Sequence, residues 1–429
     1  MDIDRQAVEA LTDRVIGPEH KALPPAAWGS TVREFLATAP VPADFQTPLL
    51  TLDRAALAAN TAIMGDWAAA HGVRLAPHGK TTMAPRLWAD QLAAGSWGLT
   101  FATLWQVQLA RAYRVRRIVL ANEALDPVGV AWLAAEAEHD PEFECWCWVD
   151  SVVAVDLLRR RWPAGAPPLR VLVEVGGPGG RTGTRDLATA RAVADAVHGA
   201  DTLRLAGVGG YEGILGADRG PAALAAVRAM LDAIAGLHEY LRDGVYDDAA
   251  LVTAGGSAYP DLVVERLAEL SDEAGARGTP TTVVLRAGAY LVHDDGFYAG
   301  ISPLTPDRAR RPLRSAMHGW ARVVSRPEPG LALLDAGKRD LPYDKGFPVP
   351  QRALIDGAWT ALPDASVTGM DDQHAYLRLP AETALPVGST VRLGLSHPCT
   401  AFDKWRLIPV LDDVEAPAPR VIDLVHTFF

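Results

Sequence analysis

The sequence predicts an α/β fold in two parts: a (β/α)8 TIM-like barrel followed by a β-rich domain. Short apolar runs alternate with Ala-rich stretches of helical periodicity up to about residue 300, which is typical of a parallel sheet. Beyond that point Pro and Gly become frequent and only short alternating runs remain. At 429 residues the chain exceeds one typical domain. We therefore expect an N-terminal segment (1–44), the barrel (45–299) and the β-rich domain (300–429).

The barrel prediction rests on nine apolar runs, one more than its eight strands require. The extra run is either an added edge strand or not a strand. The runs are residues 47–52, 73–76, 98–104, 116–121, 143–149, 169–175, 203–208, 250–254 and 281–286. Helical patterns separate most of them, and Asp53 can cap the helix that follows the first. Because active sites of such barrels lie at the carboxyl ends of the strands, residues directly after these runs are the functional candidates.

The β-rich domain is predicted from short alternating runs at 320–324, 331–334, 375–379, 390–395 and 406–410. The N-terminal segment combines one short helical pattern with a Pro/Ala-rich linker, and we expect it to pack against this domain.

The composition favours a soluble, cytoplasmic protein and does not exclude a small anionic ligand. A net charge of −11 argues against nucleic acid or an anionic membrane surface as the main partner. The first residues lack a signal-peptide pattern, and no apolar run is long enough to span a bilayer. Three cysteines are too few for a disulfide framework, and Cys145 and Cys147 alternate along one strand as core residues do.

One lysine stands at a predicted strand end. The run 73–76 leads into the turn Pro77-His78-Gly79-Lys80, and a helical pattern begins at Thr81 or Thr82. A lysine at the carboxyl end of a barrel strand can form a Schiff base with a carbonyl compound if burial or neighbouring charge lowers its pKa. The alternative is a solvated surface lysine.

Glycine-rich turns follow three other strands. Gly255-Gly256-Ser257 precedes Pro260, a suitable first residue for a helix, so its backbone N–H groups could hold a phosphate; an ordinary βα turn is the alternative. Arg181 and Tyr211 each stand among glycines that leave room for a ligand. The nucleotide-binding motifs are incomplete: Gly79-Lys80-Thr81 lacks the earlier glycine of a P-loop, and no stretch completes G-x-G-x-x-G.

The second domain contains a possible metal site. In Ser396-His397-Pro398-Cys399, the proline favours an extended His397, which would point His397 and Cys399 to the same face. An imidazole and a thiolate form a plausible half of a zinc site, and two buried core residues are the alternative. Further ligands or supporting partners could come from Asp371, Asp372 and His374.

Taken in order, these motifs resemble those of fold-type III pyridoxal-phosphate enzymes, in particular D-serine dehydratases, D-threonine aldolases and related bacterial "amino acid deaminases". The resemblance extends from about residue 47 to the C-terminus. It rests on residues 77–81, 181–183, 211–213, 255–257, 286–290 and 397–399.

The resemblance implies an alanine-racemase-type barrel with a β-domain, assembled as a homodimer. Lys80 would bind pyridoxal 5'-phosphate, Arg181 would lie near the cofactor's phenolic oxygen, and Tyr211 would sit in the cofactor site. His78 would line the pocket. The phosphate would be held by Gly255, Gly256 and Ser257, with help from Tyr290. His397 and Cys399 would bind Zn²⁺.

The implied activity is that of a PLP- and zinc-dependent dehydratase. It would convert a D-3-hydroxy amino acid such as D-serine or D-threonine to a 2-oxo acid and ammonia. Aldolases of this family typically have Asp in place of Cys399; that carboxylate suits Mn²⁺ or Mg²⁺, whereas the thiolate suits Zn²⁺. Thr82 and Met83 stand where the dehydratases often have a further His, and the glycine run 176–180 is longer than usual. Aldol cleavage to glycine and an aldehyde, racemisation and non-catalytic PLP binding are the alternatives.

Overall fold

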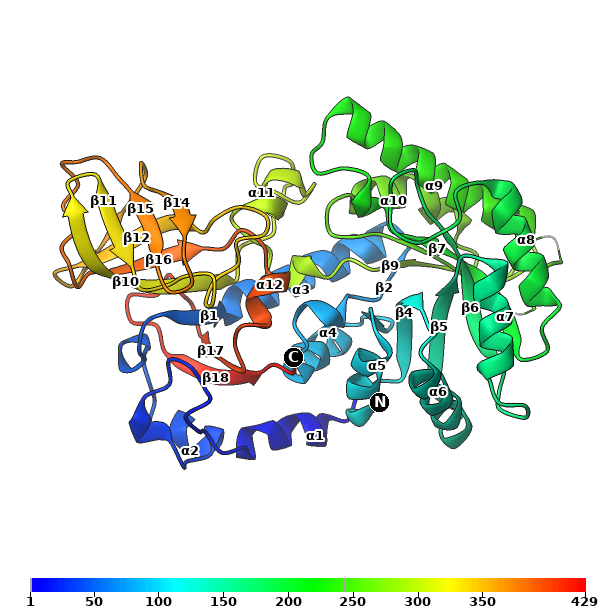
Figure 1. Ribbon diagram of the computed structural model, residues 1–429, viewed down its shortest axis with the longest axis horizontal. Coiled ribbons are helices and arrows are strands. Elements are labelled where there is room, and N and C mark those ends of the chain that lie inside the picture. Colours follow the sequence, from blue (N-terminus) through cyan, green and yellow to red (C-terminus); the bar gives the residue numbers. More distant parts are fainter. Residues whose placement is uncertain (1, 243, 248) are drawn as a thin grey trace.

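The computed structural model describes residues 2–242, 244–247 and 249–429, which form two sheets with helices around one of them (Figure 1). One sheet has eight parallel strands in the order β2-β9-β8-β7-β6-β5-β4-β3. The other has ten strands and is mostly antiparallel. The predicted fold class is confirmed. No helix within the described ranges is long and apolar enough to cross a membrane.

Eight of the nine apolar runs form the parallel sheet. Its edges are joined by a bridge between His78 and Thr100, where the Thr100 N–H donates to the Pro77 carbonyl at 2.8 Å, so the sheet closes. Inward-facing apolar side chains such as Val119 and Leu172 fill its interior. The strands are β2 (Arg74–Leu75), β3 (Leu99–Phe101), β4 (Arg117–Glu123), β5 (Glu144–Val149), β6 (Leu169–Val175), β7 (Leu203–Gly210), β8 (Ala250–Ala254) and β9 (Thr281–Leu285).

Helices cover the outside of the barrel (Figure 1). They are α3 (Arg54–Ala70), α4 (Pro85–Ala93), α5 (Leu104–Ala112), α6 (Pro127–His139), α7 (Val152–Arg161), α8 (Leu187–His198), α9 (Pro221–Arg242) and α10 (Pro260–Leu267). Two predicted helix starts are confirmed. The Asp53 carboxylate accepts the Ala56 N–H at 2.9 Å, and Pro260 is the first residue of α10. Cys145 and Cys147 are buried, as predicted for core residues.

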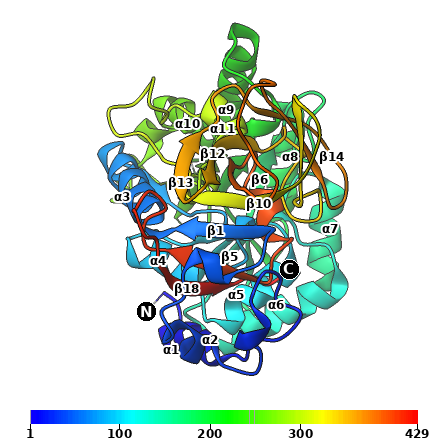
Figure 2. The same ribbon diagram turned by 90° about the vertical axis from the view of Figure 1, so that its left-hand side faces the viewer.

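The ninth run, β1 (Leu49–Asp53), belongs to the second sheet and not to the barrel. It pairs antiparallel with β10 (Met317–Glu328) and parallel with β17 (Leu407–Leu411). Figure 2 shows it crossing the middle of that sheet. The predicted barrel boundary at residue 45 is therefore too early, because a strand buried on both faces has the same apolar pattern in either sheet.

The five runs predicted in the β-rich domain all form strands: β10, β11 (Leu331–Leu334), β15 (Ala375–Arg378), β16 (Thr390–Gly394) and β17. Four further strands were not predicted: β12 (Val349–Ile355), β13 (Ala358–Ala361), β14 (Ser366–Met370) and β18 (Val421–His426). For β13 the reason is its exposure: all of its residues are exposed, so the strand carries no alternating apolar pattern.

The N-terminal segment contacts both parts of the molecule (Figure 1). Its helix α1 (Arg5–Glu9) packs on α4 of the barrel, and α2 (Val32–Leu36) packs on β18. The Lys21 ammonium lies 3.1 Å from the Asp340 carboxylate in the second domain. The predicted packing on the β-domain is found, together with an unpredicted contact with the barrel.

Candidate active site at the barrel mouth

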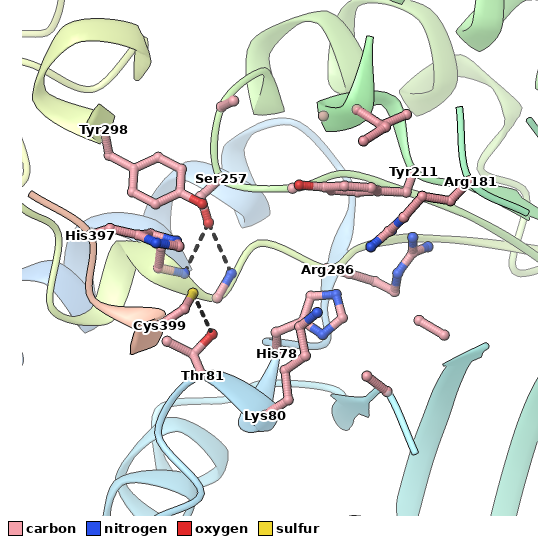
Figure 3. A pocket seen from close by; sticks show the side chains of 18 of the residues that line it. His78, Lys80, Thr81, Arg181, Tyr211, Ser257, Arg286, Tyr298, His397 and Cys399 are labelled. Atoms are coloured by element: carbon pink, nitrogen blue, oxygen red, sulfur yellow. Dashed lines mark hydrogen bonds between the residues drawn. The ribbon is translucent and has the colours of Figure 1, made fainter. Parts of the chain in front are cut away.

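A cavity of about 470 Å³ lies where the carboxyl ends of the barrel strands meet the second domain (Figure 3). Most of the residues predicted for the site line it. These are His78, Lys80, Arg181, Tyr211, Gly256, Ser257, His397 and Cys399. Gly255 and Tyr290 do not line it. The structure thus brings together side chains that are up to 321 residues apart in the sequence, as from His78 to Cys399 (399 − 78 = 321).

Lys80 stands on a short 3-10 turn, Gly79–Thr81, directly after β2. The predicted helix start at Thr81 or Thr82 is wrong: α4 begins at Pro85. Met83 has a φ of 42°, which is outside the helical region, and proline is favoured at the first helical position. The turn is fixed by the Trp88 indole N–H, which donates to the Gly79 carbonyl at 3.0 Å.

The electrostatic surroundings of Lys80 favour its neutral amine. Burial lowers the pKa of Lys80, the charge of Cys399 acts in the opposite direction, and the cations Arg181 and Arg286 lower it further. A neutral amine is the nucleophilic form that condenses with an aldehyde. Burial also holds the pKa of His78 well below its usual value, with Lys80 adding to the shift, so this imidazole is neutral.

Arg286, which sequence reasoning named only as part of a motif, is fully buried at the end of β9. Its guanidinium donates to the Thr253 hydroxyl and to the Gly210 carbonyl, both at 2.7 Å, and so connects β9 with β8 and β7. Burial lowers the pKa of Arg286 to about 10, which leaves it charged at neutral pH. The signal available in the sequence was a cation at a strand end, as for Arg181.

Tyr211 presents its ring along one side of the cavity, beside Arg181 (Figure 3). The Arg181 guanidinium lies 4.7 Å from the ring centroid. Burial, with a contribution from Glu212, raises the pKa of Tyr211 to about 12, so its phenol stays neutral. A Cβ on Gly256 would come within 2.7 Å of this ring, so only glycine fits there. The face of Tyr211 is suited to stacking against a flat ligand ring.

The Gly255–Gly256 turn differs from the prediction. The N–H groups of Gly255 and Gly256 donate to the two carboxylate oxygens of Glu212, each at 2.8 Å. Glu212 is fully buried and was not predicted. The two amides expected to hold a phosphate are thus engaged by the protein's own carboxylate. The part of the turn that lines the cavity and can meet an anion lies further on, at Ser257 and Ala258 before α10.

Tyr290 is also placed differently from the prediction. It is buried, and its hydroxyl accepts the side-chain N–H of Gln91 at 2.9 Å, so it does not reach a phosphate in the cavity.

His397 and Cys399 reach the cavity from the second domain, at the start of α12 (Cys399–Phe402). Pro398 has helical angles (φ −71°, ψ −30°), so the chain turns between the two residues; the extended conformation expected of His397 itself stays a prediction. The Cys399 thiol lies 3.7 Å from the Thr81 hydroxyl, next in sequence to Lys80 (Figure 3). The predicted lysine and the predicted metal pair therefore share one cavity.

Asp344, another residue not predicted, holds His397 in place. The Nδ1 of His397 lies 2.7 Å from one carboxylate oxygen of Asp344, and the Thr400 hydroxyl donates to the other at 2.6 Å. Burial opposes protonation of His397, but hydrogen bonds with Cys399 and Asp344 raise its pKa to about 9. A carboxylate on Nδ1 leaves Nε2 of the ring for a metal.

The three other proposed ligands lie elsewhere. Asp371 accepts the Tyr376 hydroxyl at 2.8 Å beside the β14–β15 hairpin, and Asp372 and His374 flank the same turn. None of the three lines the cavity within the described part of the chain, so they do not complete this site.

A group of three carboxylates, which sequence reasoning missed, lies at the ends of β4, β5 and β6. Oxygen atoms of Glu123, Asp150 and Glu174 lie within 4.8 Å of one another. Burial, followed by the charge of Glu123, raises the pKa of Glu174 to about 8, so this carboxyl retains its proton at neutral pH. The three residues come from separate strands, and no local motif marks them.

The cavity residues fit a pyridoxal-phosphate group and supply two ligands suited to a zinc ion. The structure offers a lysine of lowered pKa, a flat ring face and several cations beside an anion-accepting turn. The buried His78 Nδ1 and Arg286 Nε have no hydrogen-bond partner within the described ranges. The imidazole–thiol pair has the ligand chemistry of zinc.

Comparisons with known proteins agree with this geometry. The family described as "Putative serine dehydratase domain" matches residues 316–411. A D-threonine aldolase from Arthrobacter sp is 27% identical over 362 residues, which cover 83% of this chain and 86% of that protein. The solved D-threonine aldolase from Filomicrobium marinum has a TM-score of 0.74 at 25% identity and covers 91% of this chain and 97% of its own.

A D-threo-3-hydroxyaspartate dehydratase from Delftia sp. HT23 has the same fold, with a TM-score of 0.70 at 21% identity over 89% of this chain and 97% of its own. Structures of two alanine variants of such a dehydratase also match. One replaces a histidine, and the other, in a metal-free form, replaces the cysteine two positions further on.

The fold and the cavity define a pyridoxal-phosphate enzyme of fold type III. Within that class, the chain is similar to D-serine dehydratase- and D-threonine aldolase-like lyases.

The protonated Glu174 makes the stability depend on pH. Between about pH 4.5 and 8 the unfolded chain loses this proton and the folded chain keeps it. The free energy of unfolding should therefore fall as pH rises, by at most about 1.4 kcal/mol per pH unit from this group. Glu174→Gln should remove that slope in urea unfolding, and Glu382→Gln, at an exposed site, should not. If the free energy of unfolding changed with pH in the same way in wild type and Glu174→Gln, Glu174 would not be protonated in the folded protein.

Glu212 should control affinity for pyridoxal phosphate, because it shapes the turn before Ser257. In Glu212→Gln the amide oxygen can accept one glycine N–H, but the amide NH₂ is itself a donor and cannot accept the other glycine N–H. We expect the apoprotein to bind the cofactor about 10- to 100-fold more weakly in titrations of visible absorbance. The control is Glu265→Gln on the exposed side of α10, which should bind normally. Unchanged affinity in Glu212→Gln would refute this role.

Proposed function

We propose that this protein is a PLP- and zinc-dependent dehydratase of D-3-hydroxy amino acids, releasing a 2-oxo acid and ammonia. The observation that carries the proposal is the placement of Cys399 beside the lysine turn, with its thiol 3.7 Å from the Thr81 hydroxyl. An amine for the cofactor and an imidazole–thiol pair for a metal then act on one bound substrate.

The side chains of the barrel wall would hold the cofactor and move the substrate proton. Bound pyridoxal phosphate supplies an electron-withdrawing ring that stabilises negative charge at the substrate Cα. Lys80 would bind its aldehyde, Tyr211 would pack against the ring, and Arg181 would neutralise a ring oxygen. Ser257 and Ala258 would face the phosphate. The Lys80 amine, with its lowered pKa, would then be the base for the substrate Cα proton.

The second-domain wall would act on the substrate hydroxyl. His397 and Cys399 would hold Zn²⁺, a Lewis acid that assists departure of a hydroxide, which is otherwise a poor leaving group. The Asp344 carboxylate keeps the His397 ring oriented. The variants of the D-threo-3-hydroxyaspartate dehydratase support this part, because they alter a histidine and a cysteine with the same spacing.

Aldol cleavage to glycine and an aldehyde is the second candidate. It is favoured by the D-threonine aldolases among the relatives, one of them 27% identical over most of the chain. The aldolase and dehydratase reactions both need a base and a metal beside the substrate hydroxyl, so the same cavity serves either. The thiolate of Cys399 favours zinc and is our reason for placing dehydration first.

Product analysis distinguishes the two reactions. Protein loaded with pyridoxal phosphate and Zn²⁺ should release ammonia and a 2-oxo acid, in equal amounts, from a D-3-hydroxy amino acid and not from its L-enantiomer. Glycine and an aldehyde in place of ammonia would establish the aldolase reaction. A change of optical rotation alone would indicate a racemase, and cofactor absorbance without turnover a binding protein.

Removing the thiol should separate metal binding from cofactor binding. Cys399→Ala should lower bound zinc, measured by mass spectrometry of the dialysed protein, by about tenfold or more, and should abolish ammonia release. The visible absorbance of the bound cofactor should persist, since Lys80 is unchanged. The control is Cys145→Ala in the barrel core, which should keep its zinc. Full zinc content and activity in Cys399→Ala would exclude the metal role.

A further inference from the structure

The cavity wall has a marked charge imbalance. Among the described residues that line it, four are lysines or arginines and none is an aspartate or glutamate. This is unexpected in a chain with a net charge of −11. The four basic residues are Lys80, Arg181, Arg286 and Lys345. Such a site is built for a ligand with several negative charges.

Three of the four basic residues belong to the barrel wall. Lys80 is the amine for the cofactor, Arg286 is fully buried and bonded to Thr253 and Gly210, and Arg181 lies over Tyr211. Only Lys345 comes from the second domain, and it has no role in the reaction proposed above.

Lys345 lies on the same wall as the proposed metal ligands. It directly follows Asp344, which holds His397. Its ammonium is 5.2 Å from the centroid of the Phe297 ring, and that ring is 6.4 Å from the His397 ring. No carboxylate in the described part of the chain pairs with this ammonium, so its charge is available to a ligand.

We propose that Lys345 selects substrates that carry a carboxylate on C3, which makes a 3-hydroxy-D-aspartate-like diacid the preferred substrate class. This inference rests on the proposed function, because His397 and Cys399 would place the 3-hydroxyl on the second-domain wall. The remaining C3 substituent then lies beside Lys345. An ammonium there binds a carboxylate, and it gains nothing from the hydrogen of D-serine or the methyl of D-threonine.

The test compares three substrates in four proteins. Values of kcat/KM are measured with 3-hydroxy-D-aspartate, D-serine and D-threonine for wild type, Lys345→Met, Lys345→Arg and Lys404→Met. Lys404 is a second-domain lysine that does not line the cavity and pairs with Asp403, so it is the matched control. Lys345→Met should lose about 10- to 100-fold on the diacid and less than about threefold on the other two. Lys345→Arg should retain the preference, and Lys404→Met should match wild type.

A binding measurement makes the test independent of turnover. D-aspartate and D-alanine lack the 3-hydroxyl, and their dissociation constants can be read from the cofactor's visible spectrum. Wild type should favour D-aspartate, and Lys345→Met should lose that preference.

Two results would overturn the proposal. An equal loss with all three substrates would assign Lys345 to the shared α-carboxylate, and unchanged constants would place Lys345 outside the substrate site. If wild type released no ammonia from any of the three substrates, the proposed function would fail, whereas the D-aspartate preference and its loss in Lys345→Met would still decide the role of Lys345.

Discussion

The contact between the barrel mouth and the second domain is the constraint on which the site depends. The Cys399 thiol meets the Thr81 hydroxyl at 3.7 Å, and the Phe428 N–H donates to the Met83 carbonyl at 2.9 Å. Asp53 adds a third connection: one of its carboxylate oxygens caps α3 and the other accepts the Val414 N–H at 3.2 Å. These contacts hold the two walls of the cavity in a fixed relation, and two of them involve residues just after Lys80.

Buried charge on the barrel side is the second feature of this arrangement. Arg286 and Glu212 are both fully buried, and isolated charges in such positions are costly. Hydrogen bonds offset this cost. Arg286 donates to residues of β7 and β8, and Glu212 accepts from two glycine N–H groups. Together they hold the ends of β7, β8 and β9 as one rigid wall, with Tyr211 and Ser257 at its surface.

The sequence predicted what depends on local pattern. The alternation of strands and helices, the cap at Asp53 and the helix start at Pro260 follow from residues close in sequence. Lys80 stood out at the end of an apolar run, and Arg181 and Tyr211 stood out among glycines. His397 and Cys399 were singled out as an imidazole and a thiol two positions apart. The lysine's turn was predicted in the right place, although the helix start was not, because proline at 85 outweighs the apolar pattern around Met83.

What the sequence did not predict depends on contacts between distant segments. The carboxylate of Glu212 engages glycines 43 and 44 positions away (255 − 212 = 43; 256 − 212 = 44), which no local motif reveals. Asp344 and His397 lie 53 positions apart, and Glu123, Asp150 and Glu174 come from three strands. The strand β1 was assigned to the wrong sheet for a similar reason, since its partners lie in the last third of the chain.

The proposed reaction requires the lysine amine and the imidazole–thiol pair to serve a single cavity. The most direct test is an anomalous difference map at the zinc edge from crystals grown with pyridoxal phosphate and zinc. We expect a zinc peak between His397 and Cys399, facing cofactor density that is continuous with the Lys80 side chain. A zinc peak at Glu123, Asp150 and Glu174 instead, or a cofactor attached to another lysine, would contradict it.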